Sequence, residues 1–464
     1  MLKSKFYRSY AQLTAKEQKQ FAQYVVALHA EKKTVVQLLR YFQNADADIP
    51  PRAEIFRQVF GVQVPYNYRK ISDALSDLYL LVEEFLIWKK LFQNKLSERD
   101  FILLEIFRER GMHQLFGQKL DRLAQRLERQ EPRDMWSFLD RLRVHHQRYF
   151  HRHTTKADKQ TNEVVDAMQA LDRFFIASKL VYACELKSRA KIIQEKYPIS
   201  FLPQIREAIR EVKSPRPIHF ELYLSVLKLL ENPSTKSFTK LKTYFFTHAQ
   251  QLYFEDQSAI LAYLINYQAQ AIKEGQEGAV AEAFALYQFG LDNHMFIENH
   301  YISHVRFHNI VNIACNLGKY DWAADFMTDW EAYLDAANKA SAIVLGRARL
   351  AFARGEFESV LRTLQEVKFS DVFYAIRSRV LLLRTHYELH SETELILGLS
   401  KSFEVYIRRN RTIQKLTKLG LLNFIRALRI LVDWKFEKLG STQKLEQLHP
   451  VAYRDWVWAK LAEK

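Results

Sequence analysis

The sequence predicts an all-α protein, and three observations support this fold class. The 464 residues include only 12 Gly and 10 Pro, and a sheet protein needs these residues at its turns. Hydrophobic residues make up 48% of the chain and charged residues 26%, a balance that builds large cores and excludes a disordered chain. Along most of the chain, apolar residues recur at three- and four-residue steps, the period of an amphipathic helix.

Residues 1–95 are predicted to form a helical N-terminal head. Thr14 and Glu17 have the spacing of a capping box, which marks the start of a helix. An apolar cluster at 35–42, a short helix at 53–60 and a long amphipathic helix from Ile71 to Leu86 follow. Residues 96–254 then alternate helices with breaks at Gly111, at prolines and at polar stretches, which predicts a basic region of antiparallel helical hairpins.

The clearest internal repeat lies between residues 255 and 410. A glycine, an aromatic residue, a small residue and a large apolar residue occur as Gly318, Tyr320, Ala323 and Met327. A related set follows 37 residues later, and weaker copies start near Gly278 and Ser391. The second full set is Gly355, Phe357, Val360 and Leu364. Such a period is typical of stacked helical pairs.

Residues about 255–410 therefore resemble a tetratricopeptide-like repeat array. The resemblance implies a right-handed α-solenoid of helical hairpins, which residues 411–464 would close as capping helices. It departs from the family at the usual first-helix Trp, Leu and Gly and at the closing Pro, so unrelated helical hairpins remain an alternative. It also implies a concave groove that holds a protein or peptide partner, lined by His304, His308, Asn309, Asn312, Asn316 and Arg349.

Two alternative interpretations exist for the histidines of this groove, a metal site and an ordinary polar surface. His300, His304 and His308 follow one another at four-residue steps, so they are expected on one helix face, where two of them could bind a metal. The glutamate of the metalloprotease motif is missing, and ordinary polar surface is the other alternative. No metal and no cofactor are predicted.

The N-terminal head has a resemblance of its own. The segments AEIFRQVFG, PYNYRK and ISDALSDLYLLVEEFL resemble N-terminal parts of uncharacterised helical proteins from Bacteroidota. They are also similar to the last two helices of winged-helix DNA-binding domains. The sequence stays helical after Phe85, where such a domain needs a β-hairpin wing, and this departure weakens the DNA-binding interpretation.

The net charge of +16 is concentrated in residues 1–250 and 401–464, whereas residues 251–400 contain more acidic than basic side chains. Basic residues at helical spacing could neutralise phosphates, although charged faces of surface helices are commonly only solvated. Residues 141–153 also mix basic, aromatic and histidine side chains, as single-strand binding requires. No metal site is predicted there, because no nearby Cys or acidic residue completes a ligand set. The predicted basic patch comprises Lys119, Arg122, Arg126, Arg129, Arg148, Arg408, Arg409 and Arg411.

Enzyme signatures are missing from the sequence: it has no GxGxxG, phosphate loop, GxSxG, HExxH or CxxC motif. Two separated cysteines, no apolar leader and no run of about 20 apolar residues predict a cytoplasmic protein without an integral membrane segment. The sequence favours a non-catalytic scaffold or adaptor that binds a protein or peptide in its groove. The alternative is a nucleic-acid-associated regulatory protein that uses the basic N-terminal half.

Overall fold

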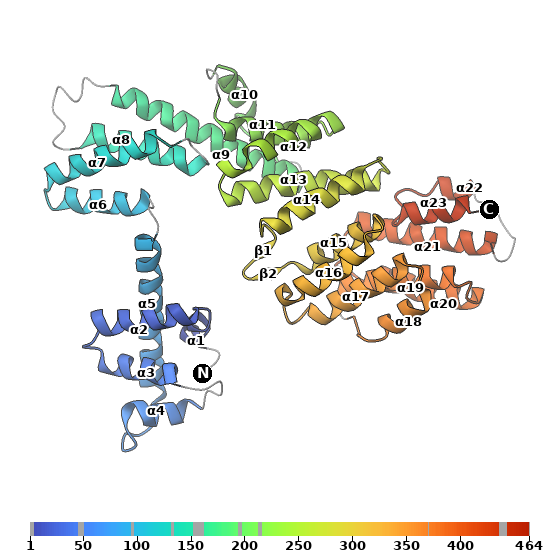
Figure 1. Ribbon diagram of the computed structural model, residues 1–464, viewed down its shortest axis with the longest axis horizontal. Helices are drawn as coiled ribbons and strands as arrows, with labels where there is room; N and C mark the ends of the chain where they lie inside the picture. The colour runs from blue at the N-terminus through green and yellow to red at the C-terminus, as the bar shows by residue number, and fades with distance from the viewer. Residues whose placement is uncertain are drawn as a thin grey trace. The chain divides into compact units, whose positions relative to one another are not determined.

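A computed structural model describes residues 4–44, 51–93, 97–130, 134–151, 162–193, 197–211, 216–369, 371–435 and 443–463. These residues form 23 α-helices, short 3-10 turns and one two-stranded hairpin (Figure 1). The predicted all-α fold class is therefore confirmed. Among the described helices, none combines the length and the apolar character that a membrane crossing requires.

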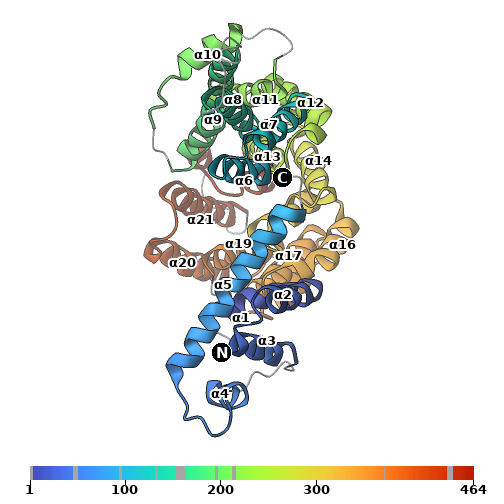
Figure 2. The ribbon, with the colours of Figure 1, turned by 90° about the vertical axis from the view of Figure 1, so that its left-hand side faces the viewer.

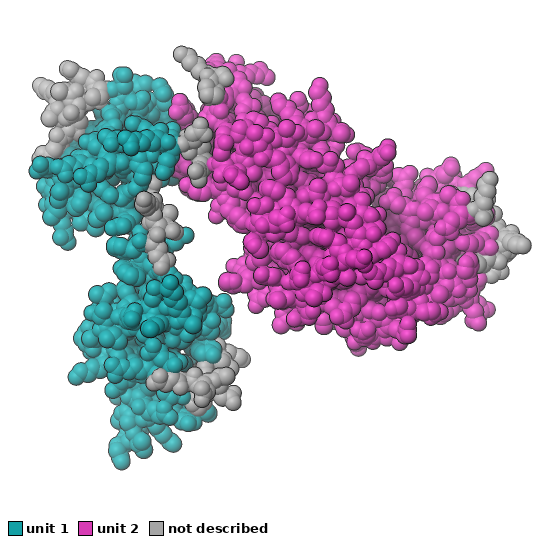
Figure 3. Space-filling view, viewed as in Figure 1, with its two compact units in different colours: residues 1–131, 139–171 teal, residues 132–138, 172–464 magenta. Residues whose placement is uncertain are grey.

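The chain divides into two compact units (Figure 3). Unit 1 contains Met1–Glu131 and Leu139–Leu171, and unit 2 contains Pro132–Phe138 and Asp172–Lys464. The division falls inside two helices, α8 (Met135–Phe150) and α9 (Glu163–Ile193). Neither unit is therefore one continuous stretch of the sequence.

The first part of unit 1 consists of five helices around their own core. The long helix α5 packs against the four helices before it (Figure 2), and the core residues run from Phe6 to Phe85. The capping box predicted at Thr14 is present: its hydroxyl accepts from the Glu17 N–H at 3.3 Å, and its N–H donates to Glu17 Oε2 at 2.8 Å. The helices are α1 (Lys5–Tyr10), α2 (Ala15–Leu28), α3 (Lys33–Asn44), α4 (Arg52–Phe60) and α5 (Tyr68–Gln93).

A second core in unit 1 lies among α6 (Ser97–Glu109), α7 (His113–Glu128) and α8. The apolar residues Leu120, Leu123 and Leu127 of α7, which repeat at three and four positions, are buried in it. Leu115, which was expected on the same side, is 47% exposed, and the neighbouring Phe116 is buried instead. The periodicity of the sequence therefore identifies the packed side of α7 except in its first turn.

Unit 2 is a succession of helices that share one continuous hydrophobic core from Phe138 to Val457. Helices that follow each other pack as neighbours, as in the pairs α11–α12, α13–α14, α15–α16 and α17–α18 (Figure 1). Besides the C-terminal part of α9, the helices are α10 (Leu202–Glu211), α11 (Ile218–Glu231), α12 (Thr235–His248), α13 (Phe254–Lys273), α14 (Ala279–Asp292), α15 (His304–Asn316), α16 (Tyr320–Trp330), α17 (Lys339–Ala353), α18 (Phe357–Leu364), α19 (Val372–Glu388), α20 (Thr393–Arg409), α21 (Lys415–Lys435), α22 (Gln443–Glu446) and α23 (Arg454–Ala462).

Five helices of unit 2 end with the same backbone turn. Gly275, His294, Gly318, Gly355 and His390 all have positive φ angles. In each case the N–H of the next residue bonds to the carbonyl five positions back, as Lys319 does to Ala314 at 3.0 Å. This pattern is the Schellman motif, which favours glycine because a Cβ opposes the left-handed conformation. The turns at Gly318 and Gly355 occupy the glycine positions of the two full sequence repeats, whereas the weaker copy at Gly278 has its turn three residues earlier, at Gly275.

A short hairpin separates α14 from α15, and it corrects one expectation. The strands β1 (Ile297–Glu298) and β2 (Tyr301–Ile302) pair antiparallel, with Ile297 opposite Ile302. Asn299 and His300 form the turn with positive φ angles of 50° and 71°, as a two-residue hairpin requires. Helix α15 starts only at His304, so the expected helical series of three histidines is wrong for His300.

Candidate functional site

Helices α15, α17 and α19 of unit 2 pack side by side, with α17 in contact with both of the others. They bring together three arginines, Arg349 on α17 and Arg377 and Arg384 on α19, which we name the arginine cluster. Arg377 and Arg384 are seven residues apart, or two helical turns, so they lie on the same side of α19. All three side chains are half-buried.

Arg349 is held by the two asparagines that face it from α15. Its Nε donates to Asn312 Oδ1 at 2.7 Å, and its Nη2 donates to Asn316 Oδ1 at 2.6 Å. An amide oxygen fixes the direction of the guanidinium but leaves its positive charge uncompensated. The pairing of these three residues agrees with their predicted position on a common surface.

Arg377 and Arg384 rest mainly on aromatic rings. The guanidinium carbon of Arg377 lies 3.5 Å from the ring centre of Phe373. That of Arg384 lies 4.4 Å from Phe352 and 5.2 Å from Trp456, which α23 contributes from the far end of the sequence. Ring faces attract cations, yet the Nε of Arg384 is buried without a hydrogen-bond partner among the described residues.

No ion pair involves a member of the arginine cluster in the described part of the chain. Burial lowers the pKa of Arg349 and of Arg377. Burial and the charge of Arg349 together lower the pKa of Arg384 to about 9. The carboxylate of Glu388 is already bound to Trp456 Nε1 at 2.7 Å and to Lys460 at 2.8 Å. Three cationic groups therefore share one region that lacks a bound anionic partner.

His308 adds a neutral imidazole to this region. Its side chain is buried and its ring lies edge-on to Phe373. Burial, followed by the charges of Arg377 and Arg349, holds the pKa of His308 well below its usual range. Its Nδ1 is buried and has no hydrogen-bond partner among the residues that the structure describes. The imidazole is consequently uncharged near neutral pH.

The other two residues of the predicted groove are placed differently from each other. His304, the first residue of α15, contacts the rings of Phe373 and Tyr374 and so lies on the side of α19. Asn309 is hydrogen-bonded to the side chain of Tyr287 on α14. His304, His308, Asn312 and Asn316 of α15 thus lie on the side of α17 and α19, where Arg349 of α17 is also found. Asn309 faces α14 instead.

The sequence did not indicate that Arg377 and Arg384 belong to this site. Their seven-residue spacing in RSRVLLLR was the one available signal, because it places both on one helix face. The spacing does not indicate which residues of other helices pack against that face. The rings of Phe352 and Trp456 reach Arg384 from elements more than 30 and 70 positions away in the sequence.

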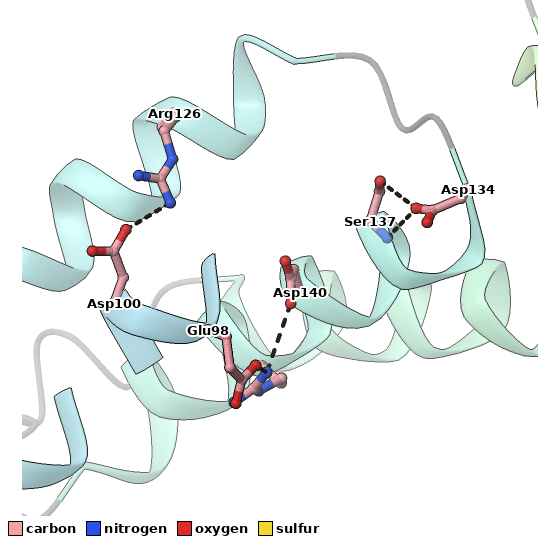
Figure 4. Close-up of polar contacts among 7 residues, drawn as sticks. Glu98, Asp100, Arg126, Asp134, Ser137 and Asp140 are labelled. Carbon is pink, nitrogen blue, oxygen red and sulfur yellow. Dashed lines mark hydrogen bonds and ion pairs between the residues drawn. The ribbon is translucent and has the colours of Figure 1, made fainter. Parts of the chain in front are cut away.

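Two of the four residues of the predicted basic stripe, which runs along α7 to Arg129, form ion pairs within unit 1. Lys119 and Arg126 both pair with Asp100 of α6, a carboxylate that is 5% exposed. Figure 4 shows the pair of Arg126 with Asp100. Arg148 pairs with Asp121 and Glu163, each at 3.0 Å. Arg122 and Arg129, the other two members of the stripe, are exposed. These two are the members that solvent and partners can reach freely.

The predicted C-terminal basic cluster follows the end of α20. Arg408 pairs with Glu404 one turn earlier at 2.8 Å, and Lys418 donates to the Arg408 carbonyl at 2.9 Å. Lys418 thereby satisfies a carbonyl that the helix end leaves open. Arg409 and Arg411 are exposed. Residues 152 and 153 of the predicted basic and aromatic segment lie outside the described residues.

A large cleft also occurs in unit 2, between α11, α13 and the first residues of α21. Its volume is about 1430 Å³, and it is lined by Tyr263, Tyr267, Lys273, Glu274 and Lys415 among others. The mixture of both charges with aromatic and amide side chains selects no ligand chemistry. The arginine cluster, which has one sign of charge, is the more specific candidate site.

No protein-family model, no curated protein and no solved structure matches this chain. The functional argument therefore depends on the geometry and the charge of the site.

Proposed function

We propose that this chain is a non-catalytic binding protein whose arginine cluster holds an acidic segment of a partner protein. The observation that carries the proposal is the gathering of Arg349, Arg377 and Arg384 without an ion-pair partner among the described residues. Burying a cation without a counter-ion is costly. A carboxylate from a partner would offset that cost, and guanidinium groups present paired donors that match its two oxygens.

The surroundings of the arginine cluster favour a peptide over a nucleic acid. Residues 251–400, which contain all three arginines, carry more acidic than basic side chains. A long polyanion that follows this region would meet net repulsion, whereas one or two carboxylates need only the local positive charge. The half-buried ring of Phe373 offers an apolar contact for a neighbouring side chain of a peptide, whereas Phe352 and Trp456 belong to the buried core and hold Arg384 in place.

The proposal includes the solenoid architecture that the resemblance implies. The sequential packing of α13 to α19 supports an array of helical hairpins, and its right-handed twist is part of the proposal that only the resemblance implies. In such an array α15, α17 and α19 are the first helices of successive pairs, and these helices line the concave side. The acidic segment would then bind on the inner surface, and the protein would act as a cytoplasmic adaptor.

The test uses a fluorescein-labelled hexaglutamate peptide as the probe. We expect the double variant Arg377→Gln with Arg384→Gln to bind it about 10- to 100-fold more weakly than the wild type, because a hydrogen bond to a charged group contributes about 1.5–3 kcal/mol. The matched control is Arg122→Gln with Arg129→Gln, which removes the same charge from an exposed surface. Fluorescence anisotropy at 50 and 200 mM salt measures both.

Two results would contradict the proposal. If both double variants lose the same affinity for hexaglutamate, the binding is general electrostatic attraction and the arginine cluster is not a site. A labelled single-stranded DNA that binds more tightly than hexaglutamate and depends on Arg122 and Arg129 would instead favour the nucleic-acid alternative.

A further inference from the structure

We propose that His145, Glu163 and Asp166 in unit 1 form a binding site for one divalent metal ion, with Zn²⁺ as the best match. His145 lies on α8, and the two acidic residues lie in the first turn of α9. One ligand atom from each residue falls within 4.8 Å of the others. This site is separate from the arginine cluster, which belongs to unit 2.

The three side chains are oriented toward one another and are only partly exposed. His145 Nδ1 lies 2.7 Å from Glu163 Oε2, and the two side chains are 20% and 15% exposed. The Asp166 carboxylate has no hydrogen bond or ion pair with another described residue. A half-buried carboxylate without a partner beside a histidine and a second carboxylate is the arrangement that a cation would complete.

Arg148 positions Glu163 without blocking it. Its Nη1 pairs with Glu163 Oε1 at 3.0 Å, and its Nη2 pairs with Asp121 at 3.0 Å. Although burial opposes it, the charges of these two carboxylates raise the pKa of Arg148. The contact leaves Glu163 Oε2 directed at His145. Residues that pair with a metal-ligating side chain and fix its direction in this way form the usual outer shell of a metal centre.

The donor types select the metal. One imidazole nitrogen and two carboxylate oxygens suit Zn²⁺, which binds both at about 2.0–2.2 Å, whereas Ca²⁺ and Mg²⁺ prefer oxygen ligands alone. Three protein ligands leave a fourth tetrahedral position for water. Among the described residues, Glu163 and Asp121 are paired with Arg148, whereas the Asp166 carboxylate has no cationic partner that a bound ion would have to displace.

Sequence reasoning excluded a metal in this region, because no acidic residue stands near the histidines of α8. The structure supplies the acidic ligands from α9, 18 and 21 positions after His145. Such ligands can be identified only after the two helices are placed together.

The experiment is a titration of the full chain with Zn²⁺ at pH 7.5 by isothermal calorimetry. We expect one site, and a loss of affinity in His145→Ala and in Asp166→Asn larger than the ~10- to 100-fold that changes to outer-shell residues produce. The control is His146→Ala, which removes the exposed histidine next in the sequence and should bind as the wild type does. Asp166→Asn keeps the size of the side chain and so guards against a folding defect.

A second readout is thermal unfolding with and without Zn²⁺. A ligand that binds only the folded state raises the unfolding temperature, so Zn²⁺ should stabilise the wild type and His146→Ala but not His145→Ala. The proposal is overturned if the wild type binds no Zn²⁺. It is equally overturned if His145→Ala binds Zn²⁺ as tightly as the wild type, since other histidines of the chain would then be responsible.

Discussion

Asp256 and His219 illustrate how burial controls single residues in the core of unit 2. The Tyr223 hydroxyl donates to Asp256 Oδ1, and His219 Nε2 lies 3.8 Å from Asp256 Oδ2. Burial raises the pKa of Asp256 to about 6, against the opposing hydrogen bond from Tyr223 and with the support of Asp134 and Glu255. Burial lowers the pKa of His219 to about 4. In the folded state, burial therefore favours the neutral forms of the Asp256 carboxyl group and the His219 imidazole.

The two shifts have opposite effects on stability in the same pH range. Between pH 4 and 6 the folded Asp256 keeps a proton that the unfolded chain releases, so this residue makes stability fall as pH rises. Between pH 4 and 6.5 the unfolded His219 holds a proton that the folded chain lacks, so this residue makes stability rise. By proton linkage the two contributions offset each other in the wild type.

Single substitutions should separate these contributions. We compare the free energy of unfolding of each variant with that of the wild type as pH increases from 4.5 to 6.5. The difference should fall by about 2–3 kcal/mol for His219→Gln and rise by about 2–3 kcal/mol for Asp256→Asn. Thermal unfolding midpoints across this pH range measure the effect. Parallel pH profiles for the wild type and both variants would show that the pair does not titrate as described.

Residue-level reasoning from the sequence succeeded where a local rule decides the outcome. The capping box at Thr14 and the left-handed glycines at 318 and 355 follow from spacing and from the conformational freedom of glycine. His294 and His390 take the same left-handed conformation without being glycine, so no glycine in the sequence marks the turn at these two positions.

At the level of elements, two glycines inside helices have opposite roles. Gly290 of α14 packs against Phe296 of the following hairpin so closely that a Cβ would overlap the ring. Gly398 of α20 is exposed and has no heavy atom within 4 Å of such a Cβ. One glycine permits a close approach, and the other only weakens its helix.

Alanine at the two positions should therefore change stability in opposite directions. Gly290→Ala should lower the free energy of unfolding by about 1–3 kcal/mol through overpacking, and Gly398→Ala should raise it by up to about 1 kcal/mol through helix propensity. Chemical denaturation of both variants tests the pair. A Gly290→Ala protein as stable as the wild type would mean that Phe296 moves aside freely.

The existence of most helices was predictable, whereas the elements that join them were not. The apolar period identified α5 and α7, and the breaks at Gly318 and Gly355 separated the helices that follow. The hairpin at 297–302 has only two residues in each strand. A strand that short has no detectable period, and its sequence was assigned to the neighbouring helix.

On the scale of the whole molecule, the net charge should determine retention on heparin, and the arginine cluster should determine binding of hexaglutamate. Replacing Arg349, Arg377 and Arg384 by Gln lowers the formal net charge of +16 by three. Retention on heparin should change little, because general attraction of a polyanion follows the charge of the entire surface. Binding of hexaglutamate should be lost. Elution from heparin at a much lower salt concentration would show that the cluster is itself the polyanion site.

The candidate site was only partly predictable because its members come from distant parts of the chain. The repeat pattern placed Asn312, Asn316 and Arg349 on one surface, and the structure joins them by hydrogen bonds. The spacing of basic residues separately predicted a basic stripe on α7, interrupted by Asp121 and Glu128. The structure instead directs Lys119 and Arg126 to Asp100, a partner that the spacing of basic residues cannot indicate.

The passage of α8 and α9 through both compact units limits how the protein can be divided. Unit 1 needs residues up to 171, whereas unit 2 already includes residues 132–138. A single cut anywhere in this interval leaves at least one of the two units without part of its chain. One proteolytic cleavage in this interval therefore cannot release both units intact. Two overlapping fragments, residues 1–171 with all of unit 1 and residues 132–464 with all of unit 2, are needed to study each unit separately.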